Sequence, residues 1–236
     1  MRVVGLHRYP VKSLQGEDLV AAEIGARGIV GDRAFALRDL ETGWVLTARR
    51  DPPLLFGFGR LEEDGRARVV LPDGTVTSDD AAISAWLGRS VALVAAPDAP
   101  STYETLVDPE DERSEVVTWQ GPAGSFHDST RTQVSIVATG DLGEWDRRRF
   151  RPNVVVEGDT ADHLVGHRVR LGTAVLSVVK QIDRCVMITR PQPGGIERDL
   201  DVYRRVRDER GTFLAVAALV EEPGRAAVGD ELTVVG

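Results

Sequence analysis

Residues 54–77, LLFGFGRLEEDGRARVVLPDGTVT, decide the fold class of this chain. Short runs that alternate apolar and polar residues are separated by two turn signals, Glu63-Asp64-Gly65 and Pro72-Asp73-Gly74. The runs are 54–61, 67–71 and 75–77. Asp-Gly between runs of this period is typical of β-hairpins. The stretch therefore predicts consecutive hairpins in a β-rich domain.

The same strand pattern continues on both sides of this stretch. Further strands are expected at 3–8, 19–24, 34–38, 44–47, 134–138, 153–156, 168–171, 174–179, 212–220 and 232–235. Helical periodicity with capping residues predicts only short helices. These are expected at 79–87, 141–149 and 200–208. Many short strands, few helices and no internal repeat predict a β-dominated α+β fold with a barrel-like architecture.

Residues 95–125 lack such a pattern and are rich in Pro, Asp, Glu and Ser. A loop of this length is unusual in a compact domain unless it marks a boundary or has a function of its own. We therefore expect a first domain over 1–95, a connecting loop or lid over 96–125, and a second domain over 126–236.

Composition excludes several classes of protein. The 236 residues are 42% hydrophobic and 28% charged, which is typical of a globular chain rather than a disordered one. With 29 basic and 37 acidic residues the net charge is −8, so nucleic acid is not an expected partner. The chain shows no secretory signal and no apolar run that could span a bilayer, so we expect a cytoplasmic protein without a membrane partner.

Cys185 is the only cysteine, so the chain cannot form an internal disulfide or supply the thiolates of an iron–sulfur cluster or a structural zinc site. It follows Arg184, and a neighbouring cation increases the thiolate fraction that a nucleophile or a soft-metal ligand needs. A lone cysteine beside a strand is more often an inert, buried apolar residue. Both interpretations stay open on local grounds.

A second candidate feature is a set of separated cations. Arg151 lies between Phe150 and the pair Pro152-Asn153, where it can act as a preorganised fork for a phosphate. Lys12 and Arg33 lie on turns in the first half of the chain. These three cations would form a site for an anionic cofactor if the fold brings them together, whereas separately each would be an exposed turn charge.

No motif indicates a nucleotide cofactor or a hydrolytic triad. The segment His127-Asp128-Ser129-Thr130 offers hydroxyl groups beside a carboxylate, but it also has the composition of a capped turn. A nucleophile elbow, a P-loop and a dinucleotide fingerprint are all absent from the sequence. An anion site of the pyridoxal phosphate kind is not expected either.

Seven short motifs occur in the order known from one family. They are Tyr9-Pro-Val-Lys12-Ser13, Gly31-Asp-Arg33, Leu46-Thr-Ala-Arg49, Asp128 with its hydroxyl neighbours, Phe150-Arg-Pro-Asn153, Arg184-Cys185 and Val228-Gly-Asp230. With them the chain resembles, over nearly its whole length, the MOSC proteins with an N-terminal β-barrel domain. That family includes the mitochondrial amidoxime reducing component and its bacterial YcbX-like relatives. The resemblance implies a barrel-like MOSC fold with an N-terminal β-barrel domain packed against it.

The resemblance also implies a molybdenum cofactor (molybdopterin), held between the two domains by its pterin and its phosphate tail. Cys185 would then be the metal ligand and a catalytic residue, and Asp128 would be a second catalytic residue near the metal. The cofactor-binding residues carried over from the family are Lys12, Ser13, Arg33, Ser129, Thr130, Arg151, Asn153 and Arg184.

The activity that the resemblance implies is the reduction of N-hydroxylated compounds, amidoximes or hydroxylamines, with loss of water. Because the chain has neither a flavin fingerprint nor cluster cysteines, electrons would come from a separate protein of the ferredoxin, flavodoxin or cytochrome b5 type, with its reductase. An alternative is a molybdenum cofactor carrier or a sulfur-transfer protein that uses a persulfide on Cys185, without reductase turnover. A third is a binding module with an inert cysteine.

The chain departs from the reductases of this family just after the cysteine. Residues 188–195 read ITRPQPGG where those reductases carry a threonine-rich turn with Asp-Pro, and Asp183 stands where some relatives have a serine. We expect the first difference to shape the substrate entrance.

Overall fold

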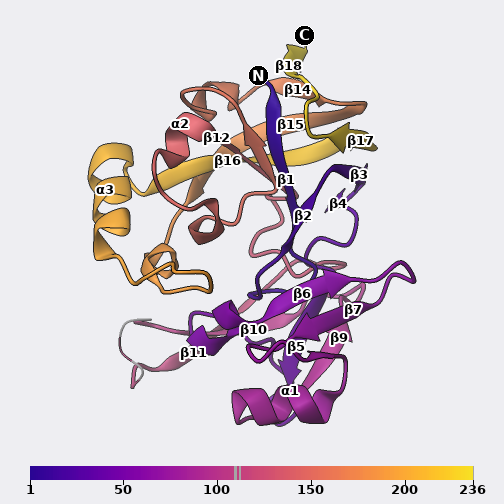
Figure 1. Ribbon diagram of the computed structural model, residues 1–236, viewed down its shortest axis with the longest axis vertical. Helices are drawn as coiled ribbons and strands as arrows, with labels where there is room; N and C mark the ends of the chain where they lie inside the picture. Colours follow the sequence, from indigo (N-terminus) through magenta and orange to yellow (C-terminus); the bar gives the residue numbers. More distant parts are fainter. Residues whose placement is uncertain (109–110, 112, 236) are drawn as a thin grey trace.

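The computed structural model describes residues 1–108, 111 and 113–235. Within these residues the largest sheet has eight strands. Their order is β18 (Leu232–Val235), β14 (Arg168–Leu171), β15 (Ala174–Asp183), β16 (Phe213–Glu222), β12 (Val134–Ala138), β13 (Val154–Val156), β1 (Val3–Arg8) and β2 (Glu17–Leu19). Only β12 and β13 pair in parallel among these neighbours. In Figure 1 this sheet forms the upper half of the molecule, and both termini lie at its top.

The N-terminal end of the chain is part of this C-terminal sheet. Strand β1 pairs with β13 through Val3, Gly5 and Leu6, so it extends the sheet beyond the segment that follows residue 126. A smaller sheet joins the two ends again, in the order β17 (Gly224–Ala227), β3 (Ala21–Gly25) and β4 (Gly28–Ile29). The first 29 residues thus tie the two halves of the chain together.

The lower half in Figure 1 consists of small antiparallel sheets. They are β6 (Phe58–Leu61), β7 (Ala67–Val70) and β8 (Val76–Thr77), then β5 (Phe35–Asp39) with β9 (Val91–Ala95), and β10 (Thr102–Leu106) with β11 (Val116–Gln120). The consecutive hairpins predicted for 54–77 are confirmed as β6, β7 and β8. Gly65 and Gly74 have φ angles of 79° and 88° in the connecting turns, as the Asp-Gly signals require.

The first half of the expected strand 54–61 is wrong. It belongs to a 3-10 helix, η1 (Pro52–Phe56), which begins with two prolines. Proline fixes φ near −65° and lacks an N–H group, so it suits the first turn of a helix better than a strand. Leu54 and Leu55 are buried from this helix, which explains their apolar character without a strand.

The expected loop at 95–125 is also wrong in part, because it contains the hairpin β10–β11. Both strands are rich in Val, Thr, Tyr and Trp, which favour strands, but an acidic connection hides the pattern. Residues 109, 110 and 112 of the expected lid lie outside the described residues. The domain boundaries at 95 and 126 stay predictions.

Two expected helices are confirmed. Helix α1 (Asp80–Leu87) begins after Asp79, whose side chain accepts a hydrogen bond from the N–H of Ala81 at 3.1 Å, and ends at Gly88. Helix α3 (Leu200–Arg210) ends at Gly211, whose φ is 58°. Both ends are left-handed C-caps, the conformation that glycine adopts without a steric cost.

The single helix expected at 141–149 is wrong. Gly143, with φ 54° and ψ −122°, ends α2 (Thr139–Leu142), and a separate 3-10 helix, η2 (Arg147–Arg149), follows. The expected strand 44–47 forms only isolated bridges, which Val45 makes to Arg38 and Tyr103. The remaining short 3-10 helices are η3 (Asp162–Leu164) and η4 (Val186–Thr189).

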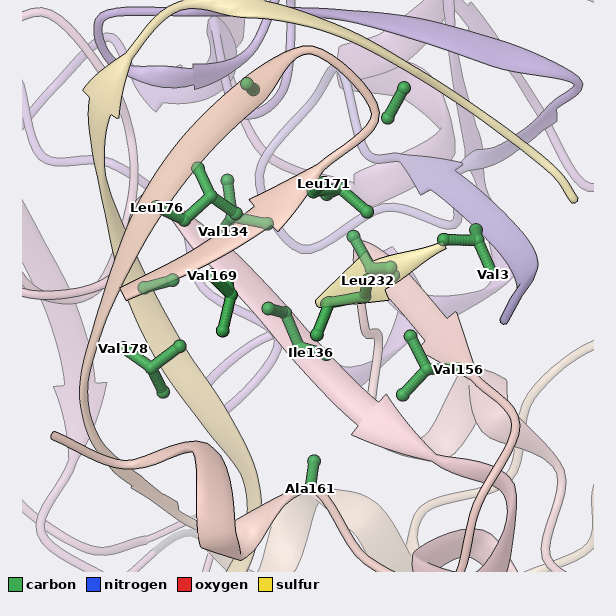
Figure 2. Close-up of a cluster of buried hydrophobic side chains, with 14 of the residues drawn as sticks. Val3, Val134, Ile136, Val156, Ala161, Val169, Leu171, Leu176, Val178 and Leu232 are labelled. Carbon is green, nitrogen blue, oxygen red and sulfur yellow. The ribbon is translucent and has the colours of Figure 1, made fainter. Parts of the chain in front are cut away.

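Each half has its own apolar core. Figure 2 shows the core of the eight-stranded sheet, where Ile136, Val156 and Leu171 are completely buried. A second core around Val69, Ile83 and Val91 supports the small sheets. The predicted fold class, a β-dominated α+β architecture with an N-terminal barrel domain, is confirmed. Within the described part of the chain, no helix is long and apolar enough to cross a membrane.

Candidate functional site

A cavity of about 640 Å³ is lined by residues from both halves of the chain. It collects nine of the ten residues that the sequence predicts for the site: Lys12, Ser13, Arg33, Asp128, Ser129, Arg151, Asn153, Arg184 and Cys185. Thr130 is the exception, because its side chain is exposed and does not line the cavity. The fold therefore brings these separated residues together, which their spacing in the sequence alone could not show.

Cys185 lies where β15 gives way to η4, and its side chain is half-buried. The guanidinium of Arg49 is close enough to this side chain for electrostatic attraction between them. Burial alone would lower the pKa of Arg49, but this interaction with Cys185 raises it. Arg49 thus brings a positive charge from the N-terminal half toward the sulfur.

Two of the three guanidinium nitrogens of Arg184 donate hydrogen bonds, and the third has no partner among the described residues. Its Nε donates to the carbonyl of Leu214 at 2.8 Å and its Nη1 to the carbonyl of Phe150 at 2.9 Å. Nη2 is buried and has no hydrogen-bond partner among the described residues. Burial, followed by repulsion from Arg33, lowers the pKa of Arg184 to about 10. A buried guanidinium in this condition favours an anionic partner.

Arg151 shows the same condition. Its Nη1 is buried, and no described residue accepts a hydrogen bond from it. Burial and then the charge of Arg33 lower the pKa of Arg151 to about 10. The guanidinium carbon atoms of Arg151 and Arg33 lie 4.4 and 5.1 Å from the centroid of the Tyr9 ring, so one aromatic ring supports both cations.

Three of the predicted site residues have left-handed backbone conformations. The φ angles are 68° at Ser13, 50° at Arg33 and 52° at Arg151. Residues other than glycine adopt this region at an energetic cost, which surrounding structure must offset. At Arg33 the offset is visible, since its N–H donates to Tyr9 and its carbonyl accepts from Phe126, both at 2.7 Å. The fold thus holds Arg33 and Arg151 on strained backbone at the wall of one cavity.

Lys12 and Asp128 form an ion pair at the edge of the cavity. Lys12 is 7% exposed and also donates to the carbonyl of Phe126 at 3.1 Å, whereas the Asp128 side chain is 79% exposed, toward the open cavity. Desolvation opposes the charge of Asp128, but the attraction of Lys12, with Arg33 and Arg49 beyond it, lowers the pKa of Asp128 to about 2. Asp128 is therefore an acceptor of hydrogen bonds at neutral pH and not a proton donor.

The polar residues beside these charges have structural contacts. Asn153 is buried, and its side-chain oxygen accepts from the N–H of Ser135 at 3.1 Å and from Ser135 Oγ at 3.0 Å. Its amide nitrogen donates to the carbonyl of His7 at 3.2 Å. Ser13 Oγ accepts from the N–H of Ala48 at 3.1 Å, and Ser129 Oγ accepts from the N–H of Arg131 at 3.1 Å. These contacts hold the turns that carry the cations.

Several lining residues were missed at the sequence level. They are Arg49, Trp119, His127, Arg149 and Lys180. Arg49 closes the motif 46–49, so that signal was available. His127 is 4% exposed, and burial followed by the charge of Arg33 lowers its pKa to about 4. Its Nε2 is buried without a hydrogen-bond partner in the described chain. Trp119 belongs to the hairpin taken for a loop.

The charge balance of the cavity differs from that of the chain. Of the described lining residues, seven are cationic and two are carboxylates, although the chain as a whole carries −8. Arg151 and Arg184, whose buried nitrogens have no hydrogen-bond partner in the described chain, are two of these seven cations. In the described chain, no group of three or more His, Cys, Asp or Glu side chains could hold a metal ion by itself. The excess of cations suits an anionic group that brings further metal ligands of its own.

Comparison with known proteins gives two domain matches that together span nearly the whole chain. Residues 1–122 match the MOSC N-terminal beta barrel domain, and residues 123–233 match the MOSC domain. None of the curated proteins matches the sequence significantly.

Among solved structures, the YUAD protein from Bacillus subtilis is 15% identical, with 98% of this chain and 93% of that chain covered and a TM-score of 0.47. YiiM from Geobacillus stearothermophilus is also 15% identical, with 52% and 67% covered and a TM-score of 0.38.

Proposed function

Because the chain belongs to the family of proteins that join a MOSC N-terminal beta barrel domain to a MOSC domain, we propose that it binds a molybdenum cofactor and reduces N-hydroxylated compounds. MOSC domains are associated with proteins that bind this cofactor. The observation that carries the proposal concerns Arg151 and Arg184, which line the same cavity as Cys185. Each has one buried guanidinium nitrogen without a hydrogen-bond partner among the described residues.

These residues suit the two ends of such a cofactor. Arg33, Arg151 and Arg184 would bind its phosphate and the polar edge of its pterin through charge-assisted hydrogen bonds. Cys185 Sγ would bind the metal, since a cysteine sulfur is a soft ligand, and Arg49 would place a positive charge beside that sulfur. Asn153 and Ser13 would act through the turns that they hold.

The bound cofactor would supply a molybdenum centre that passes two electrons from a separate redox protein to the substrate. In the overall reaction the N–O bond of the substrate breaks, two electrons and two protons are consumed, and the oxygen leaves as water. The donor would be of the ferredoxin, flavodoxin or cytochrome b5 type. We also propose a cytoplasmic location, without a nucleic acid or membrane partner.

The remaining polar groups would orient the substrate and hold protons. Asp128 is ionised at neutral pH, so its carboxylate can accept a hydrogen bond from the N–H or O–H group of an amidoxime. Lys12 Nζ is its immediate partner, and burial, the largest influence, lowers the pKa of Lys12. Lys12 Nζ thus carries the proton nearest to Asp128, and its lowered pKa makes that proton easier to release. Lys12, rather than the ionised Asp128, is the member of the pair suited to pass a proton to the leaving oxygen.

The test is the metal and pterin content of protein expressed in a host that makes the cofactor. The wild type is expected to carry near-stoichiometric molybdenum and fluorescent pterin, whereas Cys185→Ser should lose most of its molybdenum. Loaded wild type should then consume electrons from a chemical or protein donor when benzamidoxime is added. A wild type without metal and pterin, under conditions where a related enzyme loads, would contradict the proposal.

A second outcome identifies the alternative function. A wild type that loads fully but consumes no electrons with benzamidoxime or a hydroxylamine would be a cofactor carrier or a sulfur-transfer protein. The half-buried thiol of Cys185 beside Arg49 is compatible with a persulfide there. If Cys185→Ser changed neither loading nor turnover, the cysteine would be an inert residue of a binding module.

A further inference from the structure

One wall of the cavity carries no charge. The hairpin β10–β11 contributes Thr105, Val117, Thr118 and Trp119 to the lining, and none of these side chains is ionisable. The lining cations come from other segments, such as the turn that carries Lys12 and the strand β15 that carries Lys180. The cavity therefore has a cationic part, suited to an anion, and a neutral part that the anion does not require.

The register of the hairpin explains why this wall faces the cavity. Tyr103 lies opposite Trp119, and Thr105 lies opposite Val117. Residues directly opposite in an antiparallel pair share one face, and successive residues alternate between faces. The other face carries Glu104, whose carboxylate binds Arg89 at 2.6 and 2.8 Å. Thr105, Val117 and Trp119 thus share the face that lines the cavity, whereas the charge of Glu104 lies on the other face, with Thr118.

Trp119 is held in a fixed orientation. Its ring meets that of Tyr103 edge to face, with centroids 5.0 Å apart and planes at 90°. Tyr103 is fixed in turn, because its hydroxyl donates to the carbonyl of His127 at 3.0 Å and Lys12 Nζ lies 4.2 Å above its ring. The indole of Trp119 is thereby coupled to the Lys12–Asp128 pair through one ring.

The other described aromatic residue of the lining, Phe150, has a different neighbour. The guanidinium carbon of Arg184 lies 5.8 Å from the centroid of its ring, so Phe150 belongs to the cationic part of the cavity. Trp119 is the aromatic surface on the neutral side.

We propose that Trp119 determines substrate specificity, by stacking with a flat apolar substituent of an N-hydroxylated substrate whose polar group faces Asp128 and Cys185. The inference rests on the proposed function, and it identifies aromatic N-hydroxylated compounds as the preferred substrates. Aromatic pairs with offset or edge-to-face geometry add binding energy beyond their buried area. A substituent with a net charge would lose its hydration at this wall and find no ion partner there.

The experiment compares two neutral substrates that share one reacting group. Benzamidoxime carries a phenyl ring where acetamidoxime carries a methyl group. Cofactor-loaded wild type, Trp119→Ala and Trp119→Phe are assayed with both, and Trp86→Ala serves as a control because Trp86 lies on α1, against the core of the small sheets. We expect Trp119→Ala to raise the KM for benzamidoxime about tenfold, with kcat nearly unchanged. The KM for acetamidoxime should change less than about twofold.

Trp119→Phe controls for misfolding, because it keeps an aromatic ring on the neutral wall of the cavity. Its KM for benzamidoxime should lie between those of the wild type and Trp119→Ala, and Trp86→Ala should match the wild type with both substrates. Equal changes for both substrates, or no change in Trp119→Ala, would overturn the inference while leaving the proposed reductase intact.

Calorimetry separates failure of the inference from failure of the proposed function. Benzamidoxime is titrated into cofactor-loaded protein without an electron donor, so that binding is measured without turnover. If the wild type proves inactive but binds benzamidoxime about tenfold more tightly than Trp119→Ala does, the wall is assigned correctly and the reaction is not. Binding that is absent, or equal in the two proteins, would overturn the assignment of the wall.

Discussion

At the scale of single residues, two buried arginines of the cavity lower the stability of the free protein. Arg151 and Arg184 each keep a buried nitrogen without a hydrogen-bond partner among the described residues, and burial lowers the pKa of both guanidinium groups. Such groups destabilise a protein until a partner arrives, because an unpaired buried charge loses its hydration. The site is therefore preorganised for its ligand at the expense of the free protein.

Arg151→Gln should separate binding from stability. We expect it to weaken the binding of inorganic phosphate, or to reduce the retention of pterin, at least about tenfold, because a charge-assisted hydrogen bond is lost. The free energy of unfolding of the ligand-free variant should equal or exceed that of the wild type. Isothermal calorimetry measures the change in binding, and urea denaturation measures the change in stability. Arg205→Gln on α3 is the control. Unchanged phosphate binding in Arg151→Gln would contradict its assigned role.

His127 gives a prediction for the pH dependence of stability. Burial lowers its pKa from 6.5 to about 4, so the unfolded chain takes up a proton at a higher pH than the folded chain does. The stabilisation is complete above about pH 6.5 and is lost as the pH falls toward 4, by at most about 3 kcal/mol. His7, whose pKa is also lowered to about 4, adds to the loss in the same range.

Urea denaturation between pH 4 and 7 checks this, with His127→Gln beside the wild type. The variant should show a shallower fall in stability than the wild type. His163→Gln is the matched control, because His163 is exposed. Parallel curves for His127→Gln and the wild type would show that His127 is not the titrating group.

At the scale of elements, the hairpin β10–β11 depends on a buried charge network. Glu104 is completely buried, and it accepts from Arg89 at 2.6 and 2.8 Å and also from Arg50. Asp51 joins the same network, and its pKa is raised to about 6, first by burial and then by the charge of Glu104. The face of the hairpin away from the cavity is thus attached to the lower half by ion pairs.

Glu104→Gln should lower the free energy of unfolding by about 3 kcal/mol, because it removes the carboxylate that Arg50 binds and one of the three that bind Arg89. Chemical denaturation measures the loss. Glu209→Gln removes an exposed partner of Arg205 on α3 and should change stability by less than about 0.5 kcal/mol. A similar small effect at Glu104 would mean that the network contributes no stability.

The elements also show how far local sequence could predict the fold. Strand β12 and helices α1 and α3 were predictable, because periodicity and caps agree with the tertiary packing. The hairpin β10–β11 was missed, since its two strands are joined by an acidic connection and the charge of Glu104 is satisfied only by distant arginines. The helix expected at 141–149 failed at Gly143, whose unusual φ and ψ cannot be seen in the sequence.

For the site, the motifs predicted which residues matter but not how they meet. Lys12 and Arg151 come from opposite halves of the chain, and they reach one cavity because β1 pairs with β13. That pairing is a long-range contact, which local patterns do not encode. Trp119 was missed with its hairpin, and the contact of Arg49 with Cys185 depends on the packing of the two halves.

At the scale of the whole molecule, the two halves should unfold together. The eight-stranded sheet is completed by β1 and β2, so a cut between residues 122 and 123 would separate β1 from β13. The exposed edge of β13 would then lack its partner. We expect the full chain to show one cooperative thermal transition and the separate fragments 1–122 and 123–236 to lack stable tertiary structure.

Differential scanning calorimetry of the full chain, and near-ultraviolet circular dichroism of the fragments, check this expectation. Mixing the two fragments should restore a signal that neither shows alone. Two well-separated transitions in the full chain, or a fragment 1–122 that folds by itself, would show that the shared strands are not needed for either half.

The pairing of β1 with β13 also affects how the chain folds while it is being synthesised. The ribosome completes β1 among the first residues of the chain, but β13 ends at Val156. At roughly 5–20 residues per second, the outer edge of β1 waits on the order of ten seconds for its partner. During that interval an unpaired strand is open to the wrong neighbours. The architecture that joins both halves around one cavity thus leaves this edge of β1 without its strand partner until β13 has been made.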